Sequence, residues 1–259
     1  MTDVANDTED LAEGTLLSHL KELRERLIKI AASVIGLFAV LLPFNQRIFE
    51  LVSAPLFKAV PEGQMIITGT AAPLLVPFKL TFFVALFLAM PVVLYQVWAF
   101  VAPGLYKKEK RFAFPLLGSS IFLFYAGVAF AYYVVFPLVF GFFGSIDIEG
   151  APWTPDIGSY LDFITSIVLA FGIAFEVPIA TVLIVWAGLT TPERLGKIRP
   201  YVFLGAFIVG MLLTPPDVIS QTLLAIPVYL LYEAGIIMSR VFGKKPEKLA
   251  EPGDIGGVN

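Results

Sequence analysis

The stretch AFGIAFEVPIATVL, residues 170–183, contains a single ionisable side chain, Glu176, among apolar ones. It belongs to a longer apolar run, residues 160–189. A helix needs roughly 20 such residues to cross a hydrocarbon core of about 30 Å. An ionised acid near the bilayer centre costs ~2.5 kcal/mol or more, so such acids usually face a protein or water-filled interior and mark function. The stretch therefore predicts a membrane-spanning helix with one inward-facing acid, although a protonated carboxyl that only bonds a neighbouring helix is the plainer alternative.

Five further apolar runs accompany this one in a chain that is 58% hydrophobic. The six runs cover residues 27–44, 80–101, 112–140, 160–189, 201–213 and 218–238. They predict an all-α integral membrane protein with six transmembrane helices. Because the polar remainder is too small for a second domain, we expect one membrane domain over residues 1–259, with flexible cytoplasmic tails at 1–15 and 244–259.

The basic residues are distributed unevenly among the segments between these runs. Fifteen of the 18 Lys and Arg fall in residues 21–29, 107–111, 194–199 and 240–248. Lys and Arg in short flanking segments mark the cytoplasmic side. The sequence therefore predicts that both termini are cytoplasmic, and the acidic loop 145–159, which has no base, agrees with an outer face.

Prolines interrupt the predicted spans at Pro91, Pro137, Pro178 and Pro227. Proline removes a helical hydrogen bond and bends the helix around it, so curved spans are expected to enclose a concavity. The alternative is that proline is simply common in transmembrane helices. Pro200 and Pro215 also bracket the fifth run so closely that it is too short to cross the bilayer comfortably, unless its helix continues through the flanks.

Two segments on the predicted cytoplasmic side combine acids with bases. In LLSHLKELRERLIKI, residues 16–30, Glu22 and Arg26 stand four apart on an amphipathic helix. In FVAPGLYKKEKRF, residues 100–112, Glu109 lies among four bases. Ordinary surface pairs would explain both acids. A shared site for a cationic ligand, ideally a guanidinium held by bidentate hydrogen bonds, is the alternative.

Several chemistries are excluded by the residues that are missing. The chain has no cysteine, its single histidine is His19, and it contains no GxxxxGK[ST] phosphate loop. Asp162 and Asp217 both fall toward the outer boundary, which is a poor place for a membrane-embedded aspartyl dyad. We therefore expect no enzyme activity, no catalytic residue, no metal or other cofactor, and no nucleic-acid partner.

The motifs along the chain resemble those of the TatC family, the six-span core subunit of twin-arginine protein translocases. They are HLKELRERL, LVSAPL, YQVWAFVAPGLYKKEKR, FAYYVVFPLVFGF, FGIAFEVPIA, RPYVFLGAFIVGMLLTPPDVISQTLLAIP and PVYLLYEAGIIMSR, in this order. The resemblance implies a glove-like set of six helices in the cell inner membrane. It also implies a receptor that binds the twin-arginine signal peptides of folded precursor proteins and nucleates a translocation complex driven by the proton-motive force.

The same resemblance assigns roles to individual residues. It implies that Glu22 and Glu109 read the two arginines, with Arg24, Phe100 and Pro103 shaping the site. Glu176 would lie on the concave face and polarise a groove for the signal peptide. Contacts with single-span TatA/TatB-type subunits are implied at Met211, Thr214 and Gln221. Membrane lipid and further copies of the chain are the other expected partners.

Two other functions fit parts of the sequence. A proton-coupled secondary transporter would use Glu176 as its carrier, but we find no internal repeat of the kind such transporters carry. A purely structural membrane scaffold would bind Arg-Arg and Lys-Lys peptides alike. A translocase receptor would discriminate between them, because lysine cannot form the bidentate fork.

Overall fold

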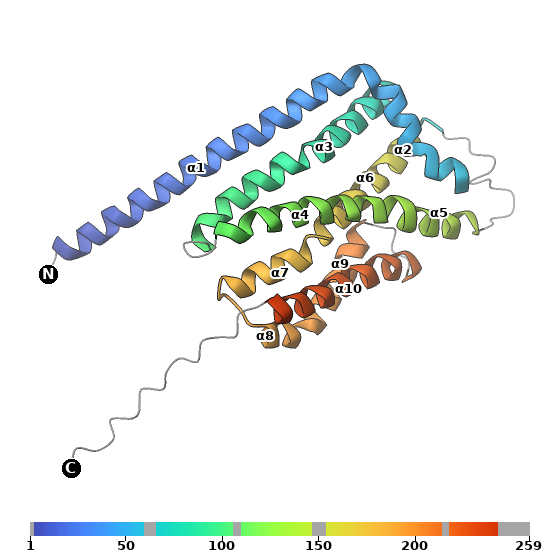
Figure 1. Ribbon diagram of the computed structural model, residues 1–259. Coiled ribbons are helices and arrows are strands. Elements are labelled where there is room, and N and C mark those ends of the chain that lie inside the picture. Colours follow the sequence, from blue (N-terminus) through green and yellow to red (C-terminus); the bar gives the residue numbers. More distant parts are fainter. Residues whose placement is uncertain (1–2, 60–65, 106–109, 147–153, 214–217, 243–259) are drawn as a thin grey trace, which may run out of the picture.

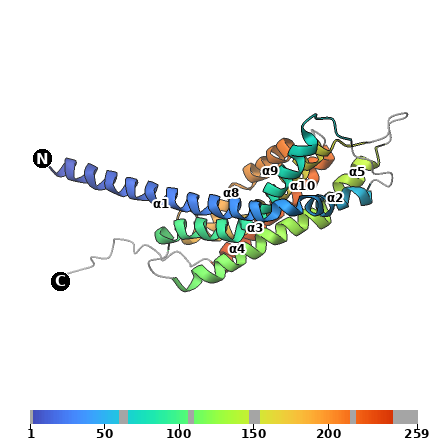
Figure 2. The same cartoon turned by 90° about the horizontal axis from the view of Figure 1, so that it is seen from above.

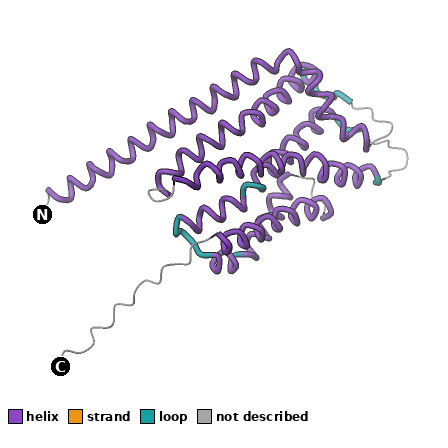
Figure 3. The backbone as a smooth tube through the Cα atoms, viewed as in Figure 1, coloured by secondary structure: helices purple, strands orange, loops and turns teal. Residues whose placement is uncertain are grey.

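The computed structural model describes residues 3–59, 66–105, 110–146, 154–213 and 218–242, and this part of the chain is helical (Figures 1 and 3). The α-helices are α1 (Asp3–Leu41), α2 (Asn45–Ala59), α3 (Ala72–Leu105), α4 (Lys110–Phe130), α5 (Phe136–Gly144), α6 (Ile157–Ala174), α7 (Val177–Trp186), α8 (Pro192–Lys197), α9 (Arg199–Leu213) and α10 (Val218–Phe242). A 3-10 turn, Leu42–Phe44, joins α1 to α2, and a π-helical segment, Ala131–Val135, joins α4 to α5. The predicted all-α class is confirmed.

Within the described residues, five helical stretches are long and apolar enough to cross a membrane. They are Leu20–Ser53, Ala72–Phe100, Phe114–Gly144, Ile157–Trp186 and Val218–Val241. The fifth predicted run forms α9, whose 15 residues rise only ~22 Å at 1.5 Å each. A sixth crossing through α9, and cytoplasmic termini, therefore remain predictions. The predicted tail at residues 1–15 is helical backbone from Asp3 onward, and residues 244–259 lie outside the described part.

The helices pack as two groups joined through the middle of the molecule. α1 lies along α3 at one edge, and its N-terminal half projects beyond the other helices (Figures 1 and 2). At the opposite edge α10 packs against α7, α8 and α9. The pair α4 and α6 lies between these groups. The functional residues of α1 and of α10 are thus held at opposite edges of one helical assembly.

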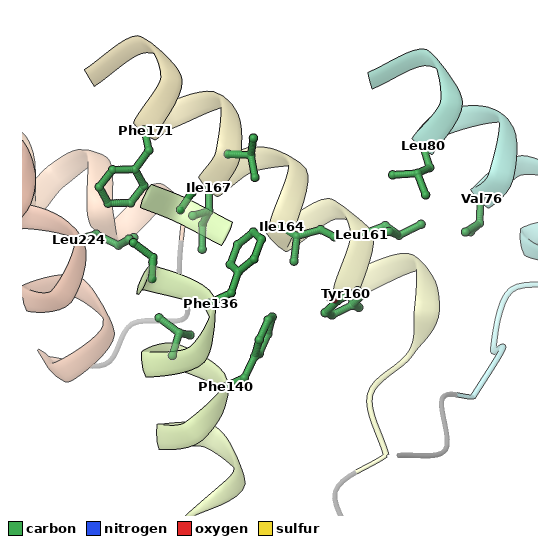
Figure 4. Packing of buried hydrophobic residues seen from close by; sticks show 14 residues of the cluster. Val76, Leu80, Phe136, Phe140, Tyr160, Leu161, Ile164, Ile167, Phe171 and Leu224 are labelled. Atoms are coloured by element: carbon green, nitrogen blue, oxygen red, sulfur yellow. The ribbon is translucent and has the colours of Figure 1, made fainter. Parts of the chain in front are cut away.

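The largest apolar cluster lies where α3, α5, α6 and α10 meet. Phe136, Phe140, Tyr160 and Ile164 point toward one another there (Figure 4). The Phe136 and Phe140 rings are 5.7 Å apart, and the Phe140 and Tyr160 rings 5.5 Å. In lipid there is little hydrophobic drive between helices, so close van der Waals packing of this kind is what holds the spans together.

Glycines let two pairs of helices approach closely. A Cβ atom on Gly127 of α4 would lie 2.5 Å from the carbonyl oxygen of Phe171 in α6, and one on Gly235 of α10 would lie 3.0 Å from Cα of Pro178 in α7. Such small residues at membrane helix contacts allow the backbones themselves to touch. The positions of α4 against α6, and of α10 against α7, are therefore fixed by these contacts.

The predicted proline bends take different forms. Pro178 coincides with a full break between α6 and α7, and Pro137 follows the π-helical segment. Pro91 stays inside α3, where it cannot donate to the carbonyl of Phe87 four residues earlier. The Tyr125 hydroxyl donates to that carbonyl at 3.0 Å, so a neighbouring helix supplies the missing bond.

The first loop after α1 contains α2, which packs on α3 and α5. The Tyr132 and Tyr160 hydroxyls donate to the α2 carbonyls of Leu51 and Val52, at 3.0 and 3.2 Å. Two segments distant in sequence also meet beside α2. Ile66 of one and Asp156 of the other form the single β bridge found within the described residues. These contacts make α2 a cap over one end of the assembly.

Candidate functional site

Glu22 and Arg26 form an ion pair on α1, at the end of the molecule remote from α2. Arg26 Nη2 lies 2.5 Å from Glu22 Oε1, and Arg26 Nε donates to the same oxygen at 3.1 Å. Arg26 also reaches α3, where it donates to Gln96 Oε1 at 3.3 Å and to the Ala99 carbonyl at 3.0 Å. The predicted i,i+4 pair is therefore also the link that joins the middle of α1 to α3. Sequence reasoning missed Gln96, because only the packing of α1 on α3 brings it to Arg26.

The other residues predicted around Glu22 are placed as follows. Phe100 is half-buried on α3, one turn after Gln96 and next to Ala99, so it lies at the same junction of α1 and α3. Arg24 follows Glu22 by two residues, about 200° around the helix, and therefore lies on the opposite side of α1. There it borders a shallow apolar groove formed by residues of α1 itself. Pro103 belongs to the backbone of α3, and Glu109 lies outside the described residues.

Glu176 occupies the break between α6 and α7. Its Oε2 accepts a hydrogen bond of 2.5 Å from the hydroxyl of Ser120 in α4, and Ser120 is fully buried. The other oxygen, Oε1, is buried without a hydrogen-bond donor in the described part of the chain. Buried polar atoms normally have a partner, and one that lacks it is costly. The structure thus places this acid against α4, and it adds Ser120, which the sequence did not reveal.

At the opposite edge, the residues predicted to contact partner subunits lie on α9 and α10. Met211 is 51% exposed, and Gln221 is half-buried at the start of α10. The two helices are close at this point, because a Cβ atom on Gly210 would lie 3.5 Å from the Gln221 carbonyl oxygen. Met211 and Gln221 are therefore brought to the same end of the α9–α10 pair. Thr214 lies outside the described residues.

The far end of the α9–α10 pair has its own polar contacts. Arg199 Nη2 donates to Glu233 Oε2 at 2.7 Å, and the Tyr229 hydroxyl donates to Glu233 Oε1 at 2.9 Å. Tyr232 donates to the Leu195 carbonyl at 2.7 Å, which ties α8 to α10. This cluster fixes α8, α9 and α10 as a unit and leaves the apolar face of α9 exposed, as Leu204 and Leu212 show at 57% and 76%.

Several long apolar helices, an acid at a helix break and an ion pair on α1 that is bonded to α3 define a multi-pass membrane protein with polar sites inside its helical assembly. Comparison with known proteins identifies the class. The profile of the family described as Sec-independent protein translocase protein (TatC) matches residues 18–227. The chain belongs to the TatC family.

Named relatives and solved structures agree with this assignment. The Sec-independent protein translocase protein TatC of Azotobacter chroococcum mcd 1 is 56% identical over 239 residues, which cover 92% of this chain and 94% of that protein. The protein of the same name from Escherichia coli K12 is 57% identical over 228 residues, 88% of each chain. A crystal structure of the twin arginine translocase receptor TatC is 39% identical, with a TM-score of 0.78 over 86% of this chain and 98% of that one.

Membership of this family settles the general role. The relatives are components of a protein translocase, so this chain is a subunit of a Sec-independent protein-export system and works with protein partners. It is a transport subunit and not an enzyme. The predicted resemblance to TatC is confirmed.

Proposed function

We propose that this chain is the core receptor subunit of a twin-arginine export system in the cell inner membrane, with both termini cytoplasmic. It binds the twin-arginine signal peptides of folded precursor proteins at the cytoplasmic face. It then nucleates the translocation complex, which the proton-motive force drives. The similarity to crystal structures of a protein described as a twin arginine translocase receptor supports this proposal.

The observation that carries the proposal is the guanidinium of Arg26 on Glu22. This contact shows that the carboxylate sits where a guanidinium group can approach it at 2.5 Å. Both bonds from Arg26 fall on Oε1, so Oε2 is the oxygen through which an arginine of a signal peptide would bind, accepting a forked pair of N–H bonds as Oε1 does from Arg26. Because Arg26 is also tied to α3, the carboxylate is held in one orientation before the ligand arrives.

Glu109 would supply the second carboxylate of the site. It follows α3 by four residues, and the end of α3 carries Phe100 beside the contact between α1 and α3. Phe100, Pro103 and Arg24 would then shape the surroundings, with Arg24 facing the α1 groove. Each charge-assisted bond to a signal arginine would contribute ~1.5–3 kcal/mol.

Glu176 would act after the signal has docked. Its half-buried carboxylate, with one oxygen bonded to Ser120, gives the protein interior a polar point that an entering peptide can use. We propose that Glu176 draws water or a proton to this level and so couples the complex to the proton-motive force. Met211, Thr214 and Gln221 would hold the single-span TatA/TatB-type subunits, on the exposed α9–α10 edge where several copies of the complex would also meet.

Photo-crosslinking of a twin-arginine signal peptide to membranes containing the full chain tests the assigned pair. Glu22→Ala with Glu109→Ala is expected to reduce specific crosslinking by roughly 10- to 100-fold, which corresponds to the loss of one charge-assisted bond or more. Glu25→Ala is the matched control, because it removes an exposed acid from the same helix. Unchanged crosslinking in the double variant, or an equal loss in the control, refutes the assignment.

A further inference from the structure

A cavity of about 690 Å³ opens between α1, α3 and α6, near the helix ends that α2 caps. Its wall is largely apolar and includes Phe38, Leu75, Val76, Phe82 and Leu161. Leu75 and Phe82 are 59% and 44% exposed, so the cavity is open on the outer surface of the helices. It lies at the opposite end of α1 and α3 from Glu22, and its volume falls within the ~300–1,000 Å³ of ordinary ligand sites.

One ion pair lines this apolar cavity. Lys79 of α3 and Asp162 of α6 form a salt bridge there, and their side chains remain 49% and 57% exposed. Lys79 lies seven residues after the start of α3 and Asp162 five after the start of α6, or about 10 and 8 Å along the two helices. Lys79 directly precedes the predicted apolar run 80–101, and Asp162 lies near the start of the run 160–189, so both are expected close to the outer boundary of the hydrocarbon core. Two accessible opposite charges are therefore expected at headgroup level, beside an apolar hollow.

We propose that this cavity binds a glycerophospholipid with a zwitterionic, primary-ammonium headgroup, that is, a phosphatidylethanolamine. One acyl chain fills the hollow, because an empty apolar cavity facing lipid would lose dispersion contacts on one side. The lipid phosphate accepts hydrogen bonds from Lys79, and the lipid ammonium donates to Asp162.

Charge complementarity selects this headgroup over the alternatives. A carboxylate only accepts hydrogen bonds, so Asp162 bonds a primary ammonium but not the trimethylammonium of a choline lipid. An anionic lipid would satisfy Lys79 but would bring no cation to offset the charge of Asp162. The proposal is separate from signal recognition, because none of the residues assigned to the signal or to partner subunits lines the cavity.

Native mass spectrometry of the full chain in detergent tests the site by measuring the binding of three lipids. These are phosphatidylethanolamine, phosphatidylcholine and phosphatidylglycerol with identical acyl chains. We expect the ethanolamine lipid to bind about tenfold more tightly than the other two, and Lys79→Met with Asp162→Leu to abolish this preference. Arg47→Gln with Glu50→Gln is the matched control. It removes one cation and one anion that are exposed on α2 outside the cavity, and the preference should persist. Equal binding of the three lipids, or a preference that survives in the Lys79 and Asp162 variant, overturns the proposal.

A photoreactive benzoylphenylalanine at Leu75 provides a second measurement that leaves the ion pair intact. Leu75 is exposed, so the larger side chain can be accommodated without repacking the core. Irradiation of membranes is expected to give a covalent adduct with the mass of a phosphatidylethanolamine. Adducts exclusively with a protein, whether a single-span helix or a signal peptide, would show that the cavity has another occupant and would contradict the proposal.

Discussion

Glu176 illustrates how one residue gains its properties from the fold around it. Ser120 bonds one carboxylate oxygen at 2.5 Å, while the other is buried with no donor among the described residues. Ser119, the preceding residue of α4, is exposed and instead donates to the Pro115 carbonyl of its own helix. The chain therefore carries two adjacent serines, of which one supports the buried acid and the other does not.

Replacing each serine by alanine separates the two roles. Ser120→Ala removes the donor to Glu176 and is expected to lower the free energy of unfolding in detergent by ~1–3 kcal/mol. Ser119→Ala should change it by no more than ~0.5 kcal/mol, as for most surface substitutions. A double-mutant cycle with Glu176→Gln should give a coupling energy of at least ~0.5 kcal/mol. Strictly additive changes in the free energy of unfolding would show that the hydrogen bond does not contribute to stability.

The hydrogen bonds of Asp156, near the end of the assembly that α2 caps, should depend on pH in a specific way. The Ser159 amide donates to Asp156 Oδ2 at 3.0 Å, and the hydroxyl and amide of Thr68 donate to Oδ1 at 2.8 and 3.0 Å. These bonds lower the pKa of Asp156 from 3.8 to about 2. A lowered pKa in the folded state means that the stabilisation is complete above the ordinary pKa and disappears as the pH falls toward the folded value.

We therefore expect the link between Thr68 and Asp156 to be independent of pH from neutrality down to about pH 4 and to weaken only between about pH 4 and 2. Hydrogen exchange of the Thr68 amide, corrected for its intrinsic rate, measures this directly. Asp156→Asn is the control and should weaken protection at neutral pH, because an amide has one acceptor oxygen instead of two. Loss of protection between pH 7 and 5 in the parent chain would contradict the assignment.

The sequence revealed a functional residue where its side chain differed strongly in polarity from its neighbours. Glu176 is conspicuous because it is the single ionisable group of residues 170–183, and its inward position followed from the cost of a charge in lipid. Ser120 and Gln96 offer less contrast, since an uncharged polar side chain costs less free energy in an apolar environment than an ionised one. Only the packing of α4 on α6, and of α1 on α3, selects them.

At the scale of elements, proline and glycine decide how the helices bend and meet. The sequence predicted bends at four prolines but not which of them would interrupt a helix. Pro178 accompanies a helix break. Pro91 does not interrupt α3, because the Tyr125 hydroxyl donates to the Phe87 carbonyl, which Pro91 cannot bond. That difference arises from a neighbouring helix and is invisible in local sequence.

Glycine substitutions on α4 test the element contacts. A Cβ atom on Gly127 would lie 2.5 Å from the Phe171 carbonyl, while nothing lies within 4 Å of one on Gly118. Gly127→Ala should destabilise the protein by ~1–3 kcal/mol, because α4 must move away from α6. Gly118→Ala on the same helix should stabilise it by up to ~1 kcal/mol, the ordinary gain in helix propensity. Thermal unfolding of both variants checks the pair, and equal effects would show that the close approach is absent.

At the scale of the whole molecule, the number of crossings determines which side each terminus occupies. In the part of the chain that the structure describes, five stretches are long enough to span, and α9 is shorter than a hydrocarbon core of about 30 Å. The six apolar runs predict six crossings, and the distribution of Lys and Arg predicts two cytoplasmic termini. If α9 failed to cross, the termini would lie on opposite sides.

The absence of cysteine from the chain makes this topology directly measurable. A membrane-impermeant maleimide added to intact cells should label Ser145→Cys in the outer loop but neither Ser18→Cys nor Lys244→Cys. Labelling all three in permeabilised cells is the control for reactivity. Outside labelling of Lys244→Cys alongside Ser145→Cys would show five crossings and overturn the six-span topology.

The central claim is that the carboxylates of Glu22 and Glu109 recognise the paired guanidinium groups of a signal peptide. The affinity of the full chain, in lipid nanodiscs, for a twin-arginine signal peptide and for its twin-lysine counterpart tests it most directly. We predict that the arginine peptide binds roughly 10- to 100-fold more tightly, because lysine cannot form the bidentate fork, and that Glu22→Ala removes most of this difference. Equal affinity of the two peptides for the unmodified chain would contradict the account.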